Sequence, residues 1–494
     1  MKKEAMWVMG MAAIASSLPL LGSGVIGLSY YLIHQEGGVG GSLILLAYGF
    51  IYLGFGVVLY RRGFGARIDM GEAVALTAIV WVVVPLLSAV PFMEASGVPF
   101  IDSLFESVSG WSTTGLTMLS GSNSSWRGVY VPRVEELDLS LKFWRTLMQW
   151  EGGLGIVIFT IAILAPPGVS AATLYLAEGK FERLEASFRR SAVLMGLIYL
   201  ALTGLGILLF RVSGMPLIDS IHHAMTGIAT AGFSTHTESL GYYIGSPYIL
   251  ISAMIVMFLG AVSFSDHYNV FRLKFDRLRR SVELKAQIVI LVLASLTGLF
   301  IWSRDPVFRE SQTPLTVVFH VVSASATAGF QAGDLHSTSE SFKMLLALLC
   351  IVGGSAFSTA GGIKVMRLLI AFKSVSMEAD KLVHPPGYVP KRMLGTYMLD
   401  EELMRKTLAT ITIFIFTYAI LVMAAIAIAP SYDPVDVVFE IASAMGNVGL
   451  STGVTSASAP IAVKAILMIA MLLGRLEVLT YIVAVNYLKR SLTR

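Results

Sequence analysis

Long apolar runs with few charges constrain this chain more than any other feature of its sequence. A helix needs about 20 mostly apolar residues to cross roughly 30 Å of hydrocarbon. The chain is 55% hydrophobic and only 14% charged, and ten of its windows reach or approach that length. These windows are 6–33, 41–60, 73–92, 146–177, 191–210, 239–265, 286–303, 344–363, 407–432 and 465–488. The sequence therefore predicts an all-α integral membrane protein with ten candidate crossings.

The positions of Lys and Arg predict the orientation of the chain in the membrane. Cytoplasmic loops are enriched in these residues, and with an even number of crossings both termini share a side. That side carries 26 of the 36 Lys and Arg residues. We therefore predict cytoplasmic termini, with window 6–33 retained as a helix rather than cleaved as a secretory signal. The same bias explains the basic clusters without a nucleic-acid partner.

Four short segments between the windows share one pattern, which we call glycine segments 1 to 4. Each has small or polar residues, then glycine, then a bulky apolar residue. The segments are Ser112-Thr113-Thr114-Gly115-Leu116, Ala229-Thr230-Ala231-Gly232-Phe233, Ala326-Thr327-Ala328-Gly329-Phe330 and Gly446-Asn447-Val448-Gly449-Leu450.

Three positions upstream of each glycine agree as well. Fifteen or sixteen residues before the glycine stand Pro99, Pro216, Pro314 and Pro434. Thirteen residues before it stand Asp102, Asp219, Thr316 and Asp436. Nine residues before it stand Glu106, His223, His320 and Glu440. Proline followed by a capping residue indicates a short helix of about ten residues, which is too short to cross a membrane.

Each short helix and its glycine segment are therefore predicted to enter and leave the membrane on one side. Non-helical backbone is tolerated at that depth only if it lines a watery cavity or is buried in protein, which favours a central pore. Helix C-termini pointing inward favour a cation there. Glycine at positive φ turns carbonyl groups toward an ion, and hydroxyl groups can add contacts. Since the segments carry no acidic ring, we predict a monovalent cation held by dipoles. The side chains expected to contribute are those of Thr113, Thr114, Thr230, Thr327 and Asn447.

These patterns resemble the Trk/Ktr/HKT superfamily of potassium transporters, and in particular its TrkH-type membrane subunits. The likeness covers nearly the whole chain. Besides the glycine segments it rests on Gln149-Trp150 before Gly152-Gly153-Leu154-Gly155, on the stretch from Gly353 to Lys364, and on Gly474-Arg475-Leu476-Glu477. The resemblance implies two extra N-terminal transmembrane helices in 1–66 and four helix, pore-loop, helix repeats in 67–180, 181–275, 276–390 and 391–494.

The resemblance also implies a function and partners. It implies channel-like potassium uptake across a bacterial cytoplasmic membrane, by a homodimer that cytoplasmic nucleotide-binding subunits of the TrkA kind regulate. In this superfamily, serine in place of the glycine of segment 1 is associated with sodium selectivity, so Gly115 favours potassium. The chain is expected to bind no cofactor and to hold only potassium ions in its pore. The implied ion contacts are at Thr113, Thr114, Thr230, Ala231, Thr327, Ala328, Asn447 and Val448.

The stretch 353–364, which we call the gate loop, interrupts an apolar window. Four glycines and three hydroxyl residues in 353–362 make a continuous helix unfavourable. We expect an unwound intramembrane gate beneath the glycine segments, the alternative being a cytoplasmic turn. Arg475, a charge within the last window, is expected to hold the closed loop through its carbonyls, with Glu477 as an alternative partner. The expected gate residues are Gly353, Gly354, Ser355, Ser358, Thr359, Gly361, Gly362, Lys364 and Arg475.

Several other polar residues admit more than one interpretation. Glu151 departs from the family pattern; it could pair with Arg145 or couple protons. Asp266 is expected to be a solvated carboxylate. His222, His223 and His320 are expected to serve packing rather than a metal or proton site.

Two further function classes remain as alternatives. One is a proton- or sodium-coupled potassium symporter, although the repeats of such transporters are normally inverted, whereas these run in one direction. The other is a membrane-embedded enzyme using Glu151 and the histidines. No nucleophile-base-acid order, phosphate loop or dinucleotide fingerprint is present, so we predict no enzyme. Because segment 4 lacks a hydroxyl, we expect a pseudo-symmetric ring whose selectivity depends mainly on Gly115, Gly232 and Gly329.

Overall fold

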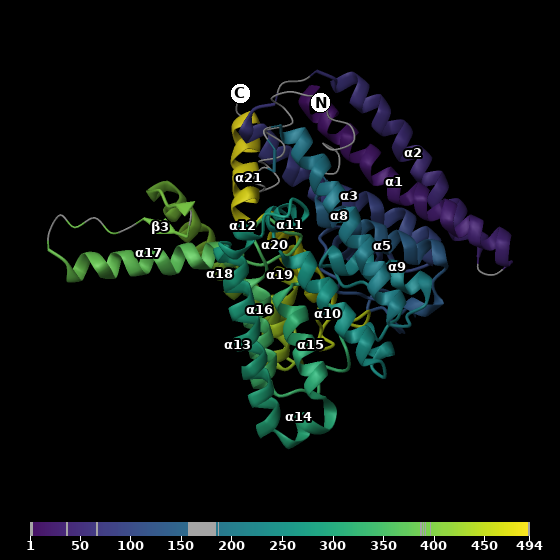
Figure 1. The fold of residues 1–494 in the computed structure, drawn as a ribbon. Helices are drawn as coiled ribbons and strands as arrows, with labels where there is room; N and C mark the ends of the chain where they lie inside the picture. Colours follow the sequence, from purple (N-terminus) through teal and green to yellow (C-terminus); the bar gives the residue numbers. More distant parts are fainter. Residues whose placement is uncertain are drawn as a thin grey trace.

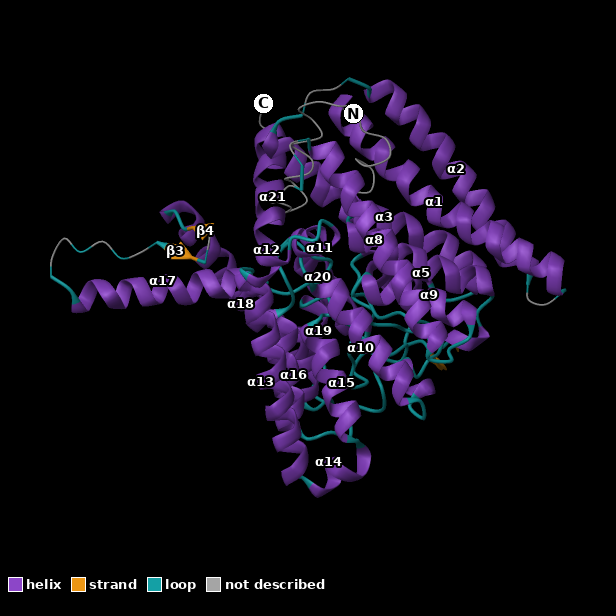
Figure 2. Cartoon of the chain, viewed as in Figure 1, coloured by secondary structure: helices purple, strands orange, loops and turns teal. Residues whose placement is uncertain are grey.

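The computed structural model describes residues 3–35, 38–65, 68–156, 184–185, 187–385, 388, 390, 392–395 and 397–492. Within these residues the chain is mostly helical (Figures 1 and 2). Three long helices come first, α1 (Lys3–His34), α2 (Val39–Gly63) and α3 (Met70–Ser96). Helices α1 and α2 pack closely because glycines face the partner backbone: a Cβ on Gly10 would overlap Tyr60 N, and one on Gly63 would overlap Trp7 N.

The four predicted short helices are present, and each has 12 residues. They are α4 (Phe100–Trp111), α9 (Leu217–Ile228), α15 (Pro314–Ser325) and α19 (Pro434–Met445). At 1.5 Å per residue, such a helix extends about 18 Å, well short of the bilayer core. The helices that lead into them are α3, α8 (Phe188–Val212), α13 (Val282–Arg304), with the short α14 (Pro306–Ser311), and α18 (Glu401–Ile428).

The helices that follow the glycine segments are shorter than a full crossing. They are α5 (Leu139–Leu154), α10 (Pro247–Ala261), α16 (Glu340–Val352) and α20 (Ile461–Leu476). The chain bends by 103° between α10 and α11 (Phe264–Phe271), and by 92° between α20 and α21 (Val478–Leu492). The gate loop separates α16 from α17 (Val365–Val383). Windows 239–265, 344–363 and 465–488 are therefore bent or interrupted rather than straight helices. The interruption at 353–362 was expected, whereas the bends after Ala261 and Leu476 were not.

Six described helices are long and apolar enough to span a membrane alone: α1, α2, α3, α8, α13 and α18. Residues 157–177 of window 146–177 lie outside the described residues. The remaining elements are short. They are β1 (Ser120–Asn123), β2 (Tyr130–Arg133), η1 (Val134–Glu136), η2 (Leu240–Tyr243), α12 (Phe275–Arg279), β3 (Met393–Leu394) and β4 (Tyr397–Met398).

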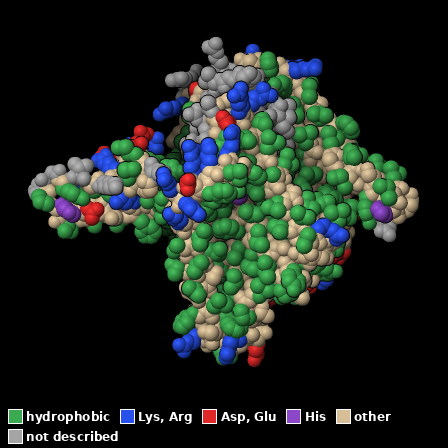
Figure 3. Space-filling model, viewed as in Figure 1, with side chains coloured by type: hydrophobic (Ala, Val, Ile, Leu, Met, Phe, Trp, Pro, Cys, Tyr) green, Lys and Arg blue, Asp and Glu red, His purple; other side chains and the backbone are tan. Residues whose placement is uncertain are grey.

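The helices form one bundle from which α17 projects sideways (Figure 1). Helix α1 begins and α21 ends at the same end of the bundle, opposite α14, which agrees with termini that share a side. In Figure 3, hydrophobic side chains cover the visible face of the bundle below the level of α17, and Lys and Arg side chains gather near that level. This distribution is that of a lipid-facing belt beneath a charged interface.

Candidate ion pathway

Each glycine segment contains two residues with positive φ, two positions apart. The glycines have φ of 92°, 78°, 72° and 102° in chain order. The residues two positions earlier have φ of 56°, 49°, 52° and 51°; they are Thr113, Thr230, Thr327 and Asn447. A β-branched residue rarely adopts this conformation without strain. In extended backbone, successive carbonyl groups point to opposite sides. In each segment, residues with positive φ alternate with residues outside that region, so successive carbonyl groups turn toward the same side.

The four glycines form a closed ring. A Cβ on any of them would overlap a carbonyl oxygen of the following segment, and the last contact returns to segment 1. In each case that oxygen belongs to the residue just before the partner glycine. The pairs are Gly115 with Ala231, Gly232 with Ala328, Gly329 with Val448, and Gly449 with Thr114. The segments therefore surround one axis in chain order, with no room for a side chain at the glycine positions.

The residues nine positions before each glycine form hydrogen bonds with residues two or three positions after the glycine of their own segment. Glu106 accepts hydrogen bonds from Thr117 Oγ1 at 2.5 Å and Met118 N at 2.6 Å. Glu440 accepts from Ser451 Oγ at 2.7 Å and Thr452 N at 3.0 Å. The histidines contact the equivalent positions, His223 Nε2 with Ser234 Oγ at 2.9 Å and His320 Nε2 with Ala332 N at 3.1 Å. This register in the sequence thus marks a repeated structural support.

Two of the residues thirteen positions before the glycine join neighbouring parts of the ring. Asp102 of α4 pairs with Lys464 of α20 at 2.5 Å, and both side chains are fully buried. Asp436 of α19 pairs with Lys343 of α16 at 2.6 Å. Each lysine is the fourth residue of its helix. In α15 the acid is replaced by Thr316, which instead completes a capping box with Thr313. Removing one partner of a buried pair of this kind strongly destabilises the fold, because the other charge stays buried without a partner.

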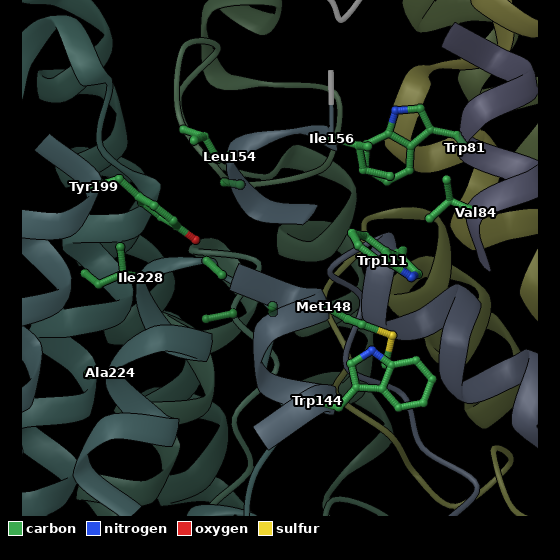
Figure 4. Close-up of a cluster of buried hydrophobic side chains, with 14 of the residues drawn as sticks. Trp81, Val84, Trp111, Trp144, Met148, Leu154, Ile156, Tyr199, Ala224 and Ile228 are labelled. Carbon is green, nitrogen blue, oxygen red and sulfur yellow. The ribbon is translucent and has the colours of Figure 1, made fainter. Parts of the chain in front are cut away.

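Tryptophans support the outer face of segment 1. Trp111, the last residue of α4, lies among Trp81, Val84 and Met148 (Figure 4). Its indole N–H donates to Ser88 Oγ of α3 at 2.9 Å. Because this ring is fully buried and hydrogen-bonded, it fixes the point at which the helix gives way to the glycine segment.

The polar side chains of the glycine segments bond to protein groups. Thr113 Oγ1 donates to Ser112 O at 2.7 Å, and Thr230 Oγ1 donates to Ala229 O at 2.7 Å. Thr327 Oγ1 accepts from Gly361 N of the gate loop at 2.8 Å. These bonds fix the hydroxyl groups, while contacts of the carbonyl and hydroxyl oxygens with an ion stay a prediction.

The amide of Asn447 also lies against protein. Its Nδ2 donates to Thr114 Oγ1 at 3.0 Å and to Met471 O of α20 at 2.8 Å. Among the described residues its Oδ1 has no hydrogen-bond partner, so contact of this oxygen with the ion stays a prediction.

The gate loop packs directly against the glycine segments. Thr359 Oγ1 lies 2.9 Å from Ile228 O and 3.2 Å from Thr230 Oγ1, in addition to the bond between Gly361 and Thr327. Gly353, Gly362 and Lys364 have φ of 72°, 75° and 83°, so the backbone cannot continue as a right-handed helix. The contacts with segments 2 and 3 favour an intramembrane loop over the alternative of a cytoplasmic turn.

Arg475 connects the gate loop with two glycine-rich stretches. Its guanidinium donates to Thr359 O at 3.4 Å, to Thr113 Oγ1 at 3.1 Å and to the carbonyls of Gly152 and Gly153. It also lies 5.1 Å from the centre of the Trp81 ring. The bond to the loop was expected, whereas the bonds to α5 were not.

Glu477 has a different role from the one considered for it. Its carboxylate pairs with Arg367 of α17 at 2.6 Å rather than with Arg475. Its backbone, with φ of 67°, lies at the break between α20 and α21.

The expected pairing of Glu151 with Arg145 was wrong. Arg145 pairs with Glu106 at 3.0 Å, lies 3.9 Å from the centre of the Phe233 ring and donates to Ser234 O at 3.3 Å. Glu151 is buried, and among the described residues its Oε1 has no hydrogen-bond partner. Sequence reasoning missed Arg145 as a link between segments 1 and 2, although Glu106 stood in the repeated register.

Asp266 and His222 are two further polar residues for which the sequence led to an expectation. Asp266 is 5% exposed and accepts from Ser281 Oγ at 3.0 Å, so the expectation of a solvated carboxylate was wrong. His222 forms a hydrogen bond with Thr146 Oγ1, and its ring packs on that of Phe143. Throughout the described ranges, no three His, Cys, Asp or Glu residues group as metal ligands.

Spanning helices around a closed ring of carbonyl groups define a membrane protein that transports cations. The TrkH family, described as cation transport protein, matches residues 50–299 and 308–491. This chain belongs to the TrkH family.

Relatives and a solved structure agree with this assignment. The Trk system potassium uptake protein TrkH of Salmonella typhimurium is 31% identical over 449 residues, covering 88% of this chain and 89% of that protein. An uncharacterized cation transporter of Methanocaldococcus jannaschii is 29% identical over 430 residues, covering 87% and 85%. The crystal structure of the potassium transporter TrkH from Vibrio parahaemolyticus matches with a TM-score of 0.77 at 24% identity, covering 96% and 97%. These relatives are transporters rather than enzymes, as predicted for this chain.

Proposed function

We propose that the chain takes up potassium through the axis of the glycine ring. The observation that supports this most strongly is the closed sequence of contacts from Gly115 to Gly449 and back. A ring of main-chain carbonyls replaces the hydration shell of a potassium ion without a fixed charge. The ion is the cargo of the protein, and the main chain at Thr113, Thr114, Thr230, Ala231, Thr327, Ala328, Asn447 and Val448 supplies the contacts.

Rubidium uptake into proteoliposomes tests this proposal. We expect uptake of radioactive rubidium without a proton gradient, reduced by excess potassium more than by excess sodium. An absence of uptake by protein that is monodisperse and folded would refute conduction. Strict dependence on a gradient would refute a passive channel.

The gate loop is proposed to close this pathway, and Arg475 is proposed to hold the closed loop through its carbonyls. Support comes from the bonds between the loop and segments 2 and 3, and from the contact of Arg475 with Thr359 O. For Arg475→Ala we expect a higher rubidium flux at an unchanged permeability ratio. Unchanged single-channel open probability would contradict the gating role.

The assembly is proposed from family membership. A homodimer in a bacterial cytoplasmic membrane, with cytoplasmic termini and a TrkA-type nucleotide-binding ring, fits the multi-subunit Trk system named for the relatives. The four repeats keep the proposed boundaries 67–180, 181–275, 276–390 and 391–494. Cysteine labelling of both termini in sealed vesicles tests the orientation, and labelling from outside would contradict it.

Coupled symport is a second candidate function, and the buried Glu151 is the observation that favours it. An unpartnered carboxylate oxygen inside a membrane protein is a common feature of proton pathways. If flux is coupled, Glu151→Gln removes its dependence on the proton gradient. If flux is passive, the same change leaves gradient-free rubidium uptake intact.

A further inference from the structure

The gate loop is also held on the side away from the glycine ring, by the first turns of α13. Glu283 Oε1 accepts hydrogen bonds from Ala356 N at 2.7 Å and from Met366 N at 3.1 Å. One turn along the same helix face, Gln287 Oε1 accepts from Ser355 Oγ at 3.0 Å. Both α13 side chains are buried. One carboxylate oxygen therefore receives two main-chain amides that lie ten residues apart in the chain.

The two amides belong to different elements. Ala356 lies in the first half of the gate loop, whereas Met366 lies in the first turn of α17. The first amides of a helix have no partner within it, and a carboxylate there also interacts favourably with the helix dipole. Hydrogen bonds to an ionised acceptor are roughly twice as strong as neutral ones. Glu283 thus joins the loop, the start of α17 and α13 at one point.

The start of α13 is itself anchored. Ser281 caps the helix at Leu284 N and donates to the buried Asp266 of α11 at 3.0 Å. At the bend between α10 and α11, Ala261 O accepts from Ser355 N at 3.1 Å and from Gln287 Nε2 at 3.3 Å. Phe264 N donates to Phe357 O at 2.7 Å. The loop is consequently clamped between this bend and α13, both of which lie outside the glycine ring.

We propose that Glu283 is a positioning residue that latches the gate loop closed. This inference rests on the proposed gating function of the loop. The bond from Ala356 N to Glu283, at 2.7 Å, is as short as the bond from Gly361 N to Thr327 on the ring side, at 2.8 Å. It is shorter than the bond from Arg475 to Thr359 O, at 3.4 Å. Helix α17 projects from the bundle, so a partner that displaces it draws Met366 N away from Glu283 (Figure 1). Release of that amide weakens the hold of the carboxylate on the loop and opens the axis.

The test combines two measurements on the full chain in proteoliposomes. The variants are Glu283→Ala, which removes the acceptor, and Glu283→Gln, which keeps an acceptor oxygen without the charge. Glu402→Gln is the matched control, because Glu402 is an exposed acid that pairs with Lys406 on α18. Amide hydrogen exchange is followed in peptides covering 353–366, and rubidium flux is followed in the same vesicles.

For Glu283→Ala we expect about tenfold faster exchange at Ala356 and Met366, as loss of a charge-assisted bond implies. We also expect a several-fold higher flux at an unchanged potassium-to-sodium ratio. Glu283→Gln should show the same changes at smaller size, and it keeps the test decisive if the alanine variant does not fold. The control should match the unaltered protein in both measurements.

Three outcomes would overturn the proposal. Unchanged exchange in both variants would show that Glu283 does not hold the loop. Faster exchange with unchanged flux, when Arg475→Ala does raise flux, would show that the loop is the gate but that Glu283 is not its latch. If neither Arg475→Ala nor Glu283→Ala changes flux despite faster exchange, the gating function itself is wrong, and the latch fails with it.

Discussion

The glycine segments and the gate loop are both buried, non-helical backbone, yet they are held in different ways. Each glycine segment follows a helix of its own repeat and is braced by a residue of that helix, such as Glu106 or Glu440. The gate loop follows α16, whose last carbonyls accept from Ile363 N and Lys364 N, but the side chains that hold it are distant in the chain. They are those of Glu283, Thr327 and Arg475. The proposed gating requires the loop, rather than the ring, to move, and supports on separate helices can release it one at a time.

Substituting a glycine of the ring should have the largest effect, and this effect should be on ion selectivity. At Gly115, with φ of 92°, a Cβ would overlap Ala231 O, so Gly115→Ser must distort two segments at once. We expect the potassium-to-sodium permeability ratio to fall by about tenfold or more, which corresponds to about 1.4 kcal/mol of discrimination. Single-channel reversal potentials measure this ratio.

Gly54→Ala is the control for that change, since Gly54 lies in α2 with no atom within 4 Å of an added Cβ. It should leave permeation unaltered. A Gly115→Ser protein with an unaltered ratio would refute the assignment of the ring as the selectivity filter.

Removing the buried Arg145, which braces segments 1 and 2, should have the next largest effect, and this effect should be a loss of stability. Arg145→Met leaves the fully buried Glu106 without its charged partner, a change that typically costs about 3–5 kcal/mol. We expect a clearly lower thermal unfolding temperature in detergent. The double change Glu106→Leu with Arg145→Leu should recover part of the loss.

Lys406→Met provides the comparison for Arg145→Met, because it removes a lysine whose pair with Glu402 is exposed and contributes little to stability. Equal destabilisation by Arg145→Met and Lys406→Met would contradict the bracing role of Arg145.

A change on the gate side should alter flux without altering selectivity. Thr327→Val keeps the shape of the side chain but leaves Gly361 N without its acceptor, a loss of about 1–3 kcal/mol if the amide stays buried. The closed loop is destabilised, so rubidium flux should rise several-fold at a constant permeability ratio. A changed ratio at constant flux would place Thr327 in the filter alone.

The smallest effect is expected where the support is redundant. Ser451→Ala removes one hydrogen bond to Glu440, whose carboxylate still accepts from Thr452 N at 3.0 Å and Thr455 N at 2.9 Å. Unfolding free energy should fall by about 1 kcal/mol or less, with normal permeation. A large loss of potassium preference would show that the brace is not redundant.

Much of the fold followed from local sequence. Apolar windows located the helices, and proline with a capping residue located the four half-helices, because both signals arise from residues close together in the chain. The same registers marked Glu106, His223, His320 and Glu440 before any contact was known. The breaks at Val262 and Glu477 were missed, since apolar composition does not distinguish a straight helix from a bent one.

For this protein, the sequence by itself determined a membrane chain with four equivalent glycine segments, because repetition and hydropathy are properties of the chain alone. Only the tertiary structure decided which groups meet: Arg145 with Glu106 rather than Glu151, the Nδ2 of Asn447 with Met471 of α20, and Glu283 with the gate loop. A buried charge is stabilised by whichever partner the fold brings within hydrogen-bond distance, and that distance depends on helices far apart in the sequence.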